Sequence, residues 1–235
     1  MSTPVLIFSR MDSERLPGKA LLPVAGRPLL ARVIDRVRLS AAGPIVVCTS
    51  ERKCDEPIAQ LAAAESVEEF RGATNDVLAR AVACVEKLGA DDFVRISGDS
   101  PFMDGQLIDR FVANHLAERP DLTTNICPRT FPYGVSIEVI STATLQRVAA
   151  LTSDAEDREH VTRYLYAHAA NFRIRNEAAE DNRYAGIVLT VDSPADLART
   201  EWIAERLATD AGLDEVVDLA REYLRIGKSN EGESR

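Results

Sequence analysis

The chain has 235 residues, of which 46% are hydrophobic and 28% charged, and its formal net charge is −9 at pH 7. This length suits one α/β domain with an adequate core, and the acidic balance without a long basic run argues against a nucleic-acid-binding surface. The chain shows no signal-peptide pattern and no apolar run of membrane-spanning length, so we expect a cytoplasmic protein that binds neither nucleic acid nor membrane.

Predicted strands and helices alternate along the first half of the chain. Short apolar runs predict strands at 5–8, 45–48, 67–70 and 93–96. Apolar residues at helical spacing predict helices from Pro28 onward and over about 55–64, 75–88 and 104–117. Thr74 or Asn75 is expected to cap the third of these helices and Gly89 to end it. This βα rhythm predicts a mostly parallel sheet with right-handed crossovers.

A stretch rich in turn residues, 128–134, interrupts this rhythm before an alternating strand at 135–140. We therefore expect a β-hairpin or flap at about 126–140 beside the ligand edge, a place for substrate selection or a dimer contact. The other expected elements are strands at 122–125, 172–176 and 187–191 and helices at 143–151, 159–169, 194–207 and 213–226. One domain over residues 1–227 and a disordered tail over 228–235 complete the prediction.

The first predicted strand leads into a cationic loop. Arg10, Arg15 and Lys19 follow residues 5–8 within the sequence SRMDSERLPGK. In open α/β sheets, ligands bind beyond the carboxyl ends of the strands, and guanidinium, ammonium and backbone N–H groups are the donors that a polyphosphate needs. The loop therefore predicts a triphosphate site, with a solvated basic surface loop as the alternative.

Two further predicted strands end in aspartates. Asp99 follows residues 93–96 in the sequence GDSP, and Asp192 follows the strand at 187–191 in the sequence VDSP. If both strands run parallel to the first, both carboxylates face the cationic loop. Two carboxylates together with substrate phosphates suit Mg²⁺, although an aspartate before a helix that starts with proline can equally be a cap. The pair together with the loop favours metal binding.

An ordered set of short motifs resembles a known family. The motifs are RMDSERLPGK at 10–19, AGRPLL at 25–30, FRG at 70–72, DVLAR at 76–80, RISGD at 95–99, RTFP at 129–132, REHVT at 158–162 and LTVDSPADL at 189–197. From about Val5 to Leu207 the chain is similar to the cytidylyltransferases of the spore-coat polysaccharide biosynthesis type. These are relatives of the enzymes that make CMP-activated 3-deoxy-octulosonate and CMP-sialic acids.

The resemblance implies a nucleotidyltransferase of the glycosyltransferase-A-like (Rossmann-like) α/β fold that acts with Mg²⁺ and usually as a homodimer. It implies Asp99 and Asp192 as metal ligands, and Arg10, Lys19 and Asp99 as catalytic residues. The nucleotide-binding residues that it implies are Ser9, Arg10, Ser13, Arg15, Lys19, Arg71, Gly72 and Asp76. The residues that it implies on the acceptor side are Arg80, Arg129, Glu138 and His160.

The implied reaction is attack of a sugar-acid (ulosonate) hydroxyl on the α-phosphorus of CTP with loss of pyrophosphate, for surface polysaccharide or glycan synthesis. The chain departs from the family pattern at Asp12 and Glu14, which add carboxylates to the loop, and at Tyr133 and Ser136, which replace acids; the latter pair predicts a changed acceptor. Alternatives are a nucleotidyltransferase that uses GTP or a sugar or polyol phosphate, and a non-catalytic nucleotide-sugar-binding partner. A glycosyltransferase is disfavoured because residues 97–99 carry one acid rather than D-x-D.

Overall fold

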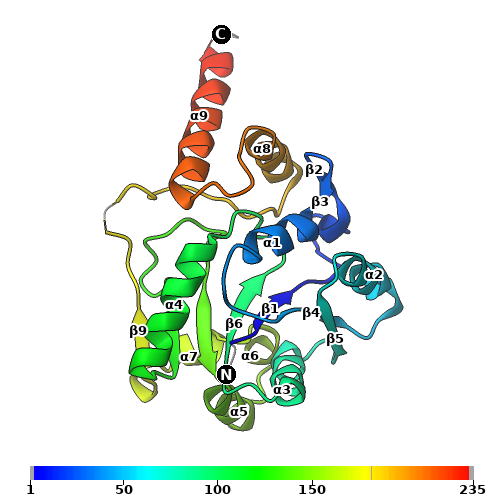
Figure 1. Ribbon diagram of the computed structural model, residues 1–235, viewed down its shortest axis with the longest axis vertical. Helices are drawn as coiled ribbons and strands as arrows, with labels where there is room; N and C mark the ends of the chain where they lie inside the picture. The colour runs from blue at the N-terminus through cyan, green and yellow to red at the C-terminus, as the bar shows by residue number, and fades with distance from the viewer. Residues whose placement is uncertain (1–2, 181, 233–235) are drawn as a thin grey trace.

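Within residues 3–180 and 182–232, which the computed structural model describes, the chain folds around a seven-stranded sheet of order β5-β4-β1-β6-β8-β7-β9. Helices cover both faces of this sheet (Figure 1). Its strands are β1 (Val5–Phe8), β4 (Ile45–Ser50), β5 (Glu68–Gly72), β6 (Asp92–Ser97), β7 (Leu122–Thr124), β8 (Glu138–Ser141) and β9 (Ile174–Asn176). Neighbouring strands are parallel except where β8 pairs with β6 and β7. The predicted α/β fold with a mostly parallel sheet is confirmed.

β1 is an inner strand of the parallel part of the sheet and is buried on both faces, as such a strand should be. Val5 and Ile7 enter the hydrophobic core on one face, and Leu6 enters the core on the other. β1 pairs with β4 and β6 so that Phe8 lies beside Cys48 and Ser97. The carboxyl ends of three strands therefore meet at one edge, where the loop after β1 begins.

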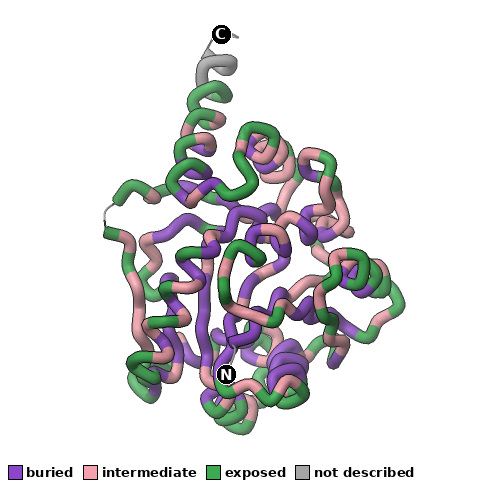
Figure 2. Tube along the Cα trace, viewed as in Figure 1, coloured by how far each residue is buried: buried purple, intermediate pink, exposed green. Residues whose placement is uncertain are grey.

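The helices form a layer on each face of the sheet. One core is shared by α1, α2, α4, α8 and α9, and the other by α3, α5 and α7. Buried residues concentrate in the sheet and on the helix sides that face it (Figure 2). The helices are α1 (Leu29–Val37), α2 (Glu56–Ala64), α3 (Val77–Leu88), α4 (Gly105–Glu118), α5 (Thr142–Leu151), α6 (Ala155–Glu159), α7 (Arg163–Ala167), α8 (Pro194–Ala204) and α9 (Leu213–Gly232), with short 3-10 turns η1 (Lys19–Leu21), η2 (Lys53–Asp55) and η3 (Ala169–Asn171).

The predicted flap is the connection between the antiparallel strands β7 and β8. Its strand begins at Glu138 rather than at residue 135. The backbone of residues 135–137 is hydrogen-bonded to the side chain of Asn125 instead of to a neighbouring strand. The amide of Asn125 donates to the carbonyl of Val135 at 2.7 Å and accepts from the N–H of Ile137 at 3.1 Å. A separate small hairpin, β2 (Pro23–Val24) with β3 (Arg27–Pro28), follows η1.

Two of the predicted helices differ from the structure in their cap or in their continuity. The cap of α3 is Asp76, whose side chain accepts from the N–H of Ala79, and not Thr74 or Asn75. The helix predicted over 159–169 is broken, because α6 ends at Glu159 and α7 begins only at Arg163. Between them Val161 is fully buried in the core. The chain turns to bury this side chain, and the turn sets His160 at the end of α6.

The prediction of a strand at 187–191 is wrong. This segment makes one isolated bridge, between Val188 and Tyr133. Its apolar pattern reflects burial, since Ile187, Leu189 and Val191 are buried while Val188 is exposed. The segment crosses the flap instead of extending the sheet, and the N–H of Val191 donates to the carbonyl of Asp99 at 3.1 Å.

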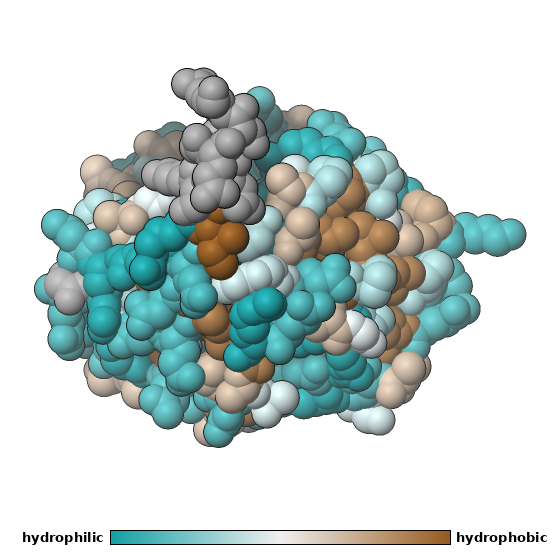
Figure 3. Space-filling view, turned by 90° about the horizontal axis from the view of Figure 1, so that it is seen from above, coloured by the Kyte–Doolittle hydropathy of each residue, from teal (hydrophilic) through white to brown (hydrophobic). Residues whose placement is uncertain are grey.

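The C-terminal helix α9 projects from the body of the protein (Figure 1). It continues past the predicted end at Ile226 to Gly232, so residues 228–232, which the sequence placed in a disordered tail, are helical; residues 233–235 lie outside the described part of the chain. Seen from this end, the surface is mostly hydrophilic with scattered hydrophobic residues (Figure 3). No helix of the described residues is both long and apolar enough to cross a membrane.

Candidate active site

A cleft of about 610 Å³ opens at the carboxyl edge of β1 and β6. It is lined by residues from the loop after β1, from α3, from the end of β6 and from the turn between α6 and α7. The predicted site residues that line it are Ser9, Arg10, Ser13, Arg15, Lys19, Arg80, Asp99, His160 and Asp192. A second cavity of about 500 Å³, between α4 and the start of α9, contains none of the predicted site residues.

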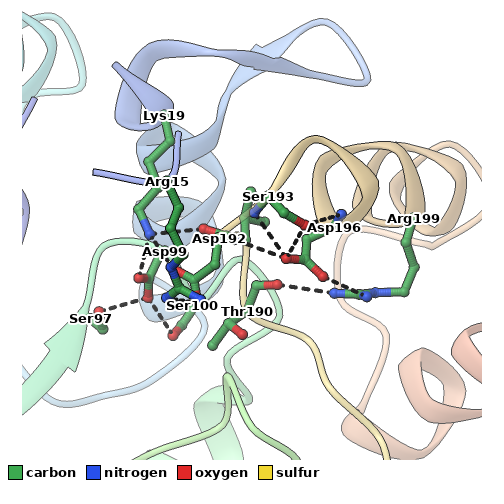
Figure 4. A network of polar contacts seen from close by, with 11 residues as sticks. Arg15, Lys19, Ser97, Asp99, Ser100, Thr190, Asp192, Ser193, Asp196 and Arg199 are labelled. Carbon is green, nitrogen blue, oxygen red and sulfur yellow. Dashed lines mark hydrogen bonds and ion pairs between the residues drawn. The ribbon is translucent and has the colours of Figure 1, made fainter. Parts of the chain in front are cut away.

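Lys19 joins the two predicted aspartates. Its ammonium donates to Asp99 Oδ2 at 2.7 Å, to Asp192 Oδ1 at 2.9 Å and to the carbonyl of Val191 at 2.8 Å (Figure 4). These three acceptors use all three N–H donors of the ammonium group. Asp99 and Asp192 therefore meet at the cationic loop as predicted, although Asp192 arrives on an irregular segment and not on a strand.

Short-range contacts hold each aspartate in place. Asp99 Oδ1 accepts from the hydroxyl of Ser97 at 2.7 Å. Asp192 Oδ2 lies 3.0 Å from the guanidinium of Arg15. Just beyond it, Ser193 and Asp196 form a capping box that begins α8 (Figure 4). The turn after β6 also needs Gly98, because a Cβ there would lie 2.8 Å from the Cβ of Ser9.

The carboxylate oxygens of the two aspartates suit a divalent cation as ligands. Their carboxylate oxygens already lie within hydrogen-bond distance of one cationic atom, Lys19 Nζ. Hard oxygen ligands of this kind suit Mg²⁺, which commonly binds through one or two carboxylates plus substrate phosphates and water. Among the described residues no group of three or more His, Cys, Asp or Glu side chains gathers around one point. The remaining ligands of an ion held here would therefore be phosphate and water oxygens.

The loop after β1 is anchored by Asp55, which sequence reasoning missed. Asp55 is 0% exposed, and its Oδ1 accepts from the N–H of Met11 at 2.7 Å while Oδ2 accepts from the hydroxyl of Ser50. Asp12, one of the two acids that depart from the family pattern, pairs with Arg52 at 2.5 Å. The hydrogen bond from Arg52 lowers the pKa of Asp12. Asp12 thus strengthens the base of the loop, whereas Glu14 lines the cleft.

Arg80 is a buried cation at the wall of the cleft. It is 3% exposed, its Nη1 donates to the carbonyl of Ala73 at 3.2 Å, and its Nε is buried without a partner among the described residues. Burial lowers the pKa of Arg80, but arginine remains charged at neutral pH. Within the described part of the chain no carboxylate forms an ion pair with it, and burying an unpaired charge is costly. An anionic ligand would supply the missing counter-charge.

Five predicted site residues do not line the cleft: Arg71, Gly72, Asp76, Arg129 and Glu138. Arg71 bonds to Glu56 and to the carbonyls of Ser50 and Arg52. Asp76 caps α3 and pairs with Arg158 at 2.5 Å. Arg129 donates to Ser136 at 3.0 Å, and its guanidinium lies 4.4 Å from the centre of the Tyr133 ring. Gly72 packs close to Arg80, whose Cγ would be 3.1 Å from an added Cβ.

Arg95 lines the cleft but was not predicted as a site residue. It donates to Glu138, which is 1% exposed and lies behind it. A signal was present in the sequence, because Arg95 stands between Val94 and Ile96 in a strand that is otherwise apolar at its centre. A charged residue in a buried strand is rarely placed there without a partner or a ligand.

A mostly parallel sheet with a cationic loop after β1, and with two acids at the same edge, is typical of a nucleotide-binding enzyme of the nucleotidyltransferase class. The family model described as cytidylyltransferase matches residues 4–226. The chain belongs to the cytidylyltransferase family, which confirms the resemblance.

Individual relatives agree with this assignment. The Bacillus subtilis spore coat polysaccharide biosynthesis protein SpsF is 32% identical over 200 residues, covering 81% of each chain. A 3-deoxy-manno-octulosonate cytidylyltransferase from Hahella chejuensis is 36% identical over 136 residues, which cover 53% of this chain and 49% of that protein. The solved structure of a cytidylyltransferase from Leptospira borgpetersenii has a TM-score of 0.88 at 28% identity, covering 99% of this chain and 96% of that one.

Proposed function

We propose that the protein transfers CMP from CTP to a hydroxyl of an ulosonic acid, with Mg²⁺ and with release of pyrophosphate. The product would be an activated sugar for surface polysaccharide or glycan synthesis in the cytoplasm. The proposal rests mainly on one observation: Lys19 donates hydrogen bonds to both Asp99 and Asp192 at the carboxyl edge of the sheet. The names of the Bacillus and Hahella relatives support a polysaccharide pathway and an ulosonate acceptor.

The loop after β1 would bind the triphosphate. Arg10, Arg15 and Lys19 would neutralise the charge that builds on the pyrophosphate oxygens as the bond to the α-phosphorus breaks. Since Lys19 uses its three donors on Asp99, Asp192 and Val191, it reaches a phosphate only by giving up one of these bonds. The loop and the two aspartates are therefore expected to rearrange locally when nucleotide binds.

Asp99 and Asp192 would hold Mg²⁺, which when bound orients the α-phosphate and lowers the pKa of the attacking hydroxyl. The oxygen of that hydroxyl forms the new bond to phosphorus, its proton passes to solvent, and pyrophosphate leaves. No covalent intermediate with the protein is required, so the protein contributes positioning and electrostatic stabilisation.

The acceptor would bind on the side of Arg80 and His160, with Arg129 on the adjoining flap. Tyr133 and Ser136 replace two acids of the family pattern and give Arg129 neutral partners. An acid at either position could pair with this guanidinium, so the replacements leave its charge available for an anionic acceptor. We propose that these two residues tune which sugar acid is accepted.

We further propose a homodimer formed through the flap. Tyr133 and Val188 are bridge partners and expose 58% and 40% of their surface, so they form an apolar patch on this face. Light scattering should give the mass of a dimer, and Tyr133→Ser should shift it toward the monomer. A wild-type protein that is monomeric at all concentrations would contradict the proposal.

The test of the proposed reaction is pyrophosphate release with Mg²⁺ and each of CTP, GTP, UTP and ATP. Each nucleotide is paired with a panel of ulosonic acids, sugar phosphates and polyol phosphates. We expect release only with CTP and an ulosonate, and loss of release in Asp99→Ala. Release with another nucleotide or with a phosphorylated acceptor would overturn the specificity, and CTP binding without release for any pair would overturn the activity.

A further inference from the structure

Arg95 places a guanidinium on the floor of the cleft, next to the proposed metal ligands. It lies on β6 two residues before Ser97, which bonds to Asp99. Its side chain is 26% exposed and its Cζ lies 5.8 Å from the centre of the Phe8 ring. Side chains two apart on a strand share a face, so Arg95 points to the same side of the sheet as Ser97.

A buried chain of hydrogen bonds fixes this guanidinium. Arg95 donates to Glu138 Oε2, directly opposite on β8. Tyr166 on α7 donates to Glu138 Oε1 at 2.6 Å, and Thr124 Oγ1 lies 2.8 Å from the Tyr166 oxygen. Burial and the nearby charge of Glu138 raise the pKa of Tyr166, so its hydroxyl remains a donor. Glu138, at 1% exposed, is held behind Arg95 and does not reach the cleft.

The guanidinium keeps donors that this chain does not use. Arginine carries five N–H groups in a planar fork. Within the described residues Glu138 is the hydrogen-bond partner of Arg95, and Nε is buried without one. Nε is out of reach of the cleft, but the side chain is 26% exposed, so guanidinium N–H groups that Glu138 does not occupy can donate to an anion there. Charge-assisted hydrogen bonds of this kind are the usual way in which arginine binds a carboxylate.

Arg95 and the triphosphate loop line the same cleft but are anchored in different directions. That loop is anchored toward β4 and α2 through Asp55, whereas Arg95 is anchored toward β8 and α7 through Glu138. The triphosphate has Arg10, Arg15 and Lys19 to bind it. An anion at Arg95 would thus belong to the other substrate, whose hydroxyl must approach the α-phosphate near Asp99.

We propose that Arg95 binds the carboxylate of the acceptor sugar acid, and that Glu138 and Tyr166 position Arg95 for this contact. The inference rests on the proposed function and names the residue that selects an acid over a neutral sugar. It changes the role expected of Glu138 from acceptor contact to positioning residue.

The test compares an ulosonic acid with its neutral amide as acceptor. The variants are Arg95→Gln, Arg95→Lys and Tyr166→Phe, and the matched control is Arg147→Gln. Arg147 also stacks on a phenylalanine, at 4.7 Å from the centre of the Phe172 ring, but it is exposed on α5 and does not line the cleft. The readouts are kcat and KM for both acceptors, KM for CTP, and Tm.

Loss of one charge-assisted contact should lower kcat/KM for the acid about 10- to 100-fold in Arg95→Gln. The effect should fall on the KM of the acid, with KM for CTP and turnover of the amide unchanged, so the preference for the acid falls by the same factor. Arg95→Lys should recover part of the lost kcat/KM for the acid, and Tyr166→Phe should lower this kcat/KM by a smaller factor. Arg147→Gln should match the wild type.

Removing Arg95 leaves the buried carboxylate of Glu138 without its partner, which destabilises the fold. The double variant Arg95→Gln with Glu138→Gln removes that charge and keeps the test valid if the single variant unfolds. A wild-type enzyme that accepts no sugar acid overturns the proposed reaction and this role with it. An active enzyme whose acid preference survives in Arg95→Gln, or whose KM for CTP rises instead, overturns the role of Arg95 alone.

Discussion

Asp55 is predicted to control nucleotide affinity without touching the nucleotide. In Asp55→Ala, the N–H of Met11 and the hydroxyl of Ser50 lose a charged, buried acceptor together. We expect the free energy of unfolding to fall by about 3 kcal/mol and Tm to fall by about 6–12 °C for a chain of this size.

The same change should weaken CTP binding because the loop after β1 is no longer fixed. Reordering the backbone of even one residue on binding costs about 1–2 kcal/mol, which corresponds to a KM for CTP that is about 5- to 30-fold higher. The acceptor KM should not change. Differential scanning calorimetry and pyrophosphate release at varied CTP measure the two effects.

The control for this experiment is Asp35→Ala, which removes a half-exposed partner of Arg27 on the surface and should cost less than about 1 kcal/mol. Asp55→Asn keeps an acceptor oxygen of the same shape and should lie between the wild type and Asp55→Ala. If Asp55→Ala lowers Tm but leaves KM for CTP unchanged, Asp55 supports only the fold and the argument about the loop is refuted.

Further predictions concern chemistry, pH dependence and thiol reactivity. Lys19→Met should lower kcat at saturating CTP by about 100-fold or more, and a variant with full kcat would exclude Lys19 from the reaction. The hydrogen bond with His115 holds the pKa of Asp92 below its usual 3.8, so this carboxylate stabilises the fold at neutral pH and the benefit is lost as the pH falls below that value. Urea unfolding should show a lower free energy of unfolding for Asp92→Asn than for the wild type at pH 7, and equal values for the two proteins in acid. The same difference between the two proteins at both pH values would contradict this role of Asp92. Burial raises the pKa of Cys48, so a thiol reagent should modify exposed Cys54 in the folded protein and Cys48 only after unfolding; rapid labelling of Cys48 would contradict the packing of β4.

Local patterns were sufficient to predict most of the fold. The run at residues 5–8 became β1 because side chains buried on both faces leave a continuous apolar signal, and Gly89 ends α3 in the left-handed conformation, as expected. The same reasoning failed at residues 187–191, where alternating burial is produced by packing on the flap rather than by a strand ladder. Hydrophobic pattern records burial, and it does not record which backbone groups are paired.

The site was predictable only where its residues carry a local signal. Arg10, Arg15 and Lys19 are close in sequence, and their arrangement in one loop could be read directly. Asp55 could not be assigned in this way because its partner, Met11, is 44 residues away. Arg95 stands out as a charge in an apolar strand, but its role could not be read because its partner, Glu138, is 43 residues away. Contacts of that range arise from the tertiary fold and leave no periodicity or spacing in the chain.

The measurement that tests the central claim most directly is transfer of a radiolabel from CTP to an ulosonic acid. CTP labelled at the α-phosphate is compared with CTP labelled at the γ-phosphate, with Mg²⁺ and with Asp192→Asn alongside. We predict that only the α-label appears in the sugar product, that the γ-label leaves as pyrophosphate, and that the variant transfers neither. Transfer of the γ-label, or α-label transfer that is unchanged in Asp192→Asn, would contradict it.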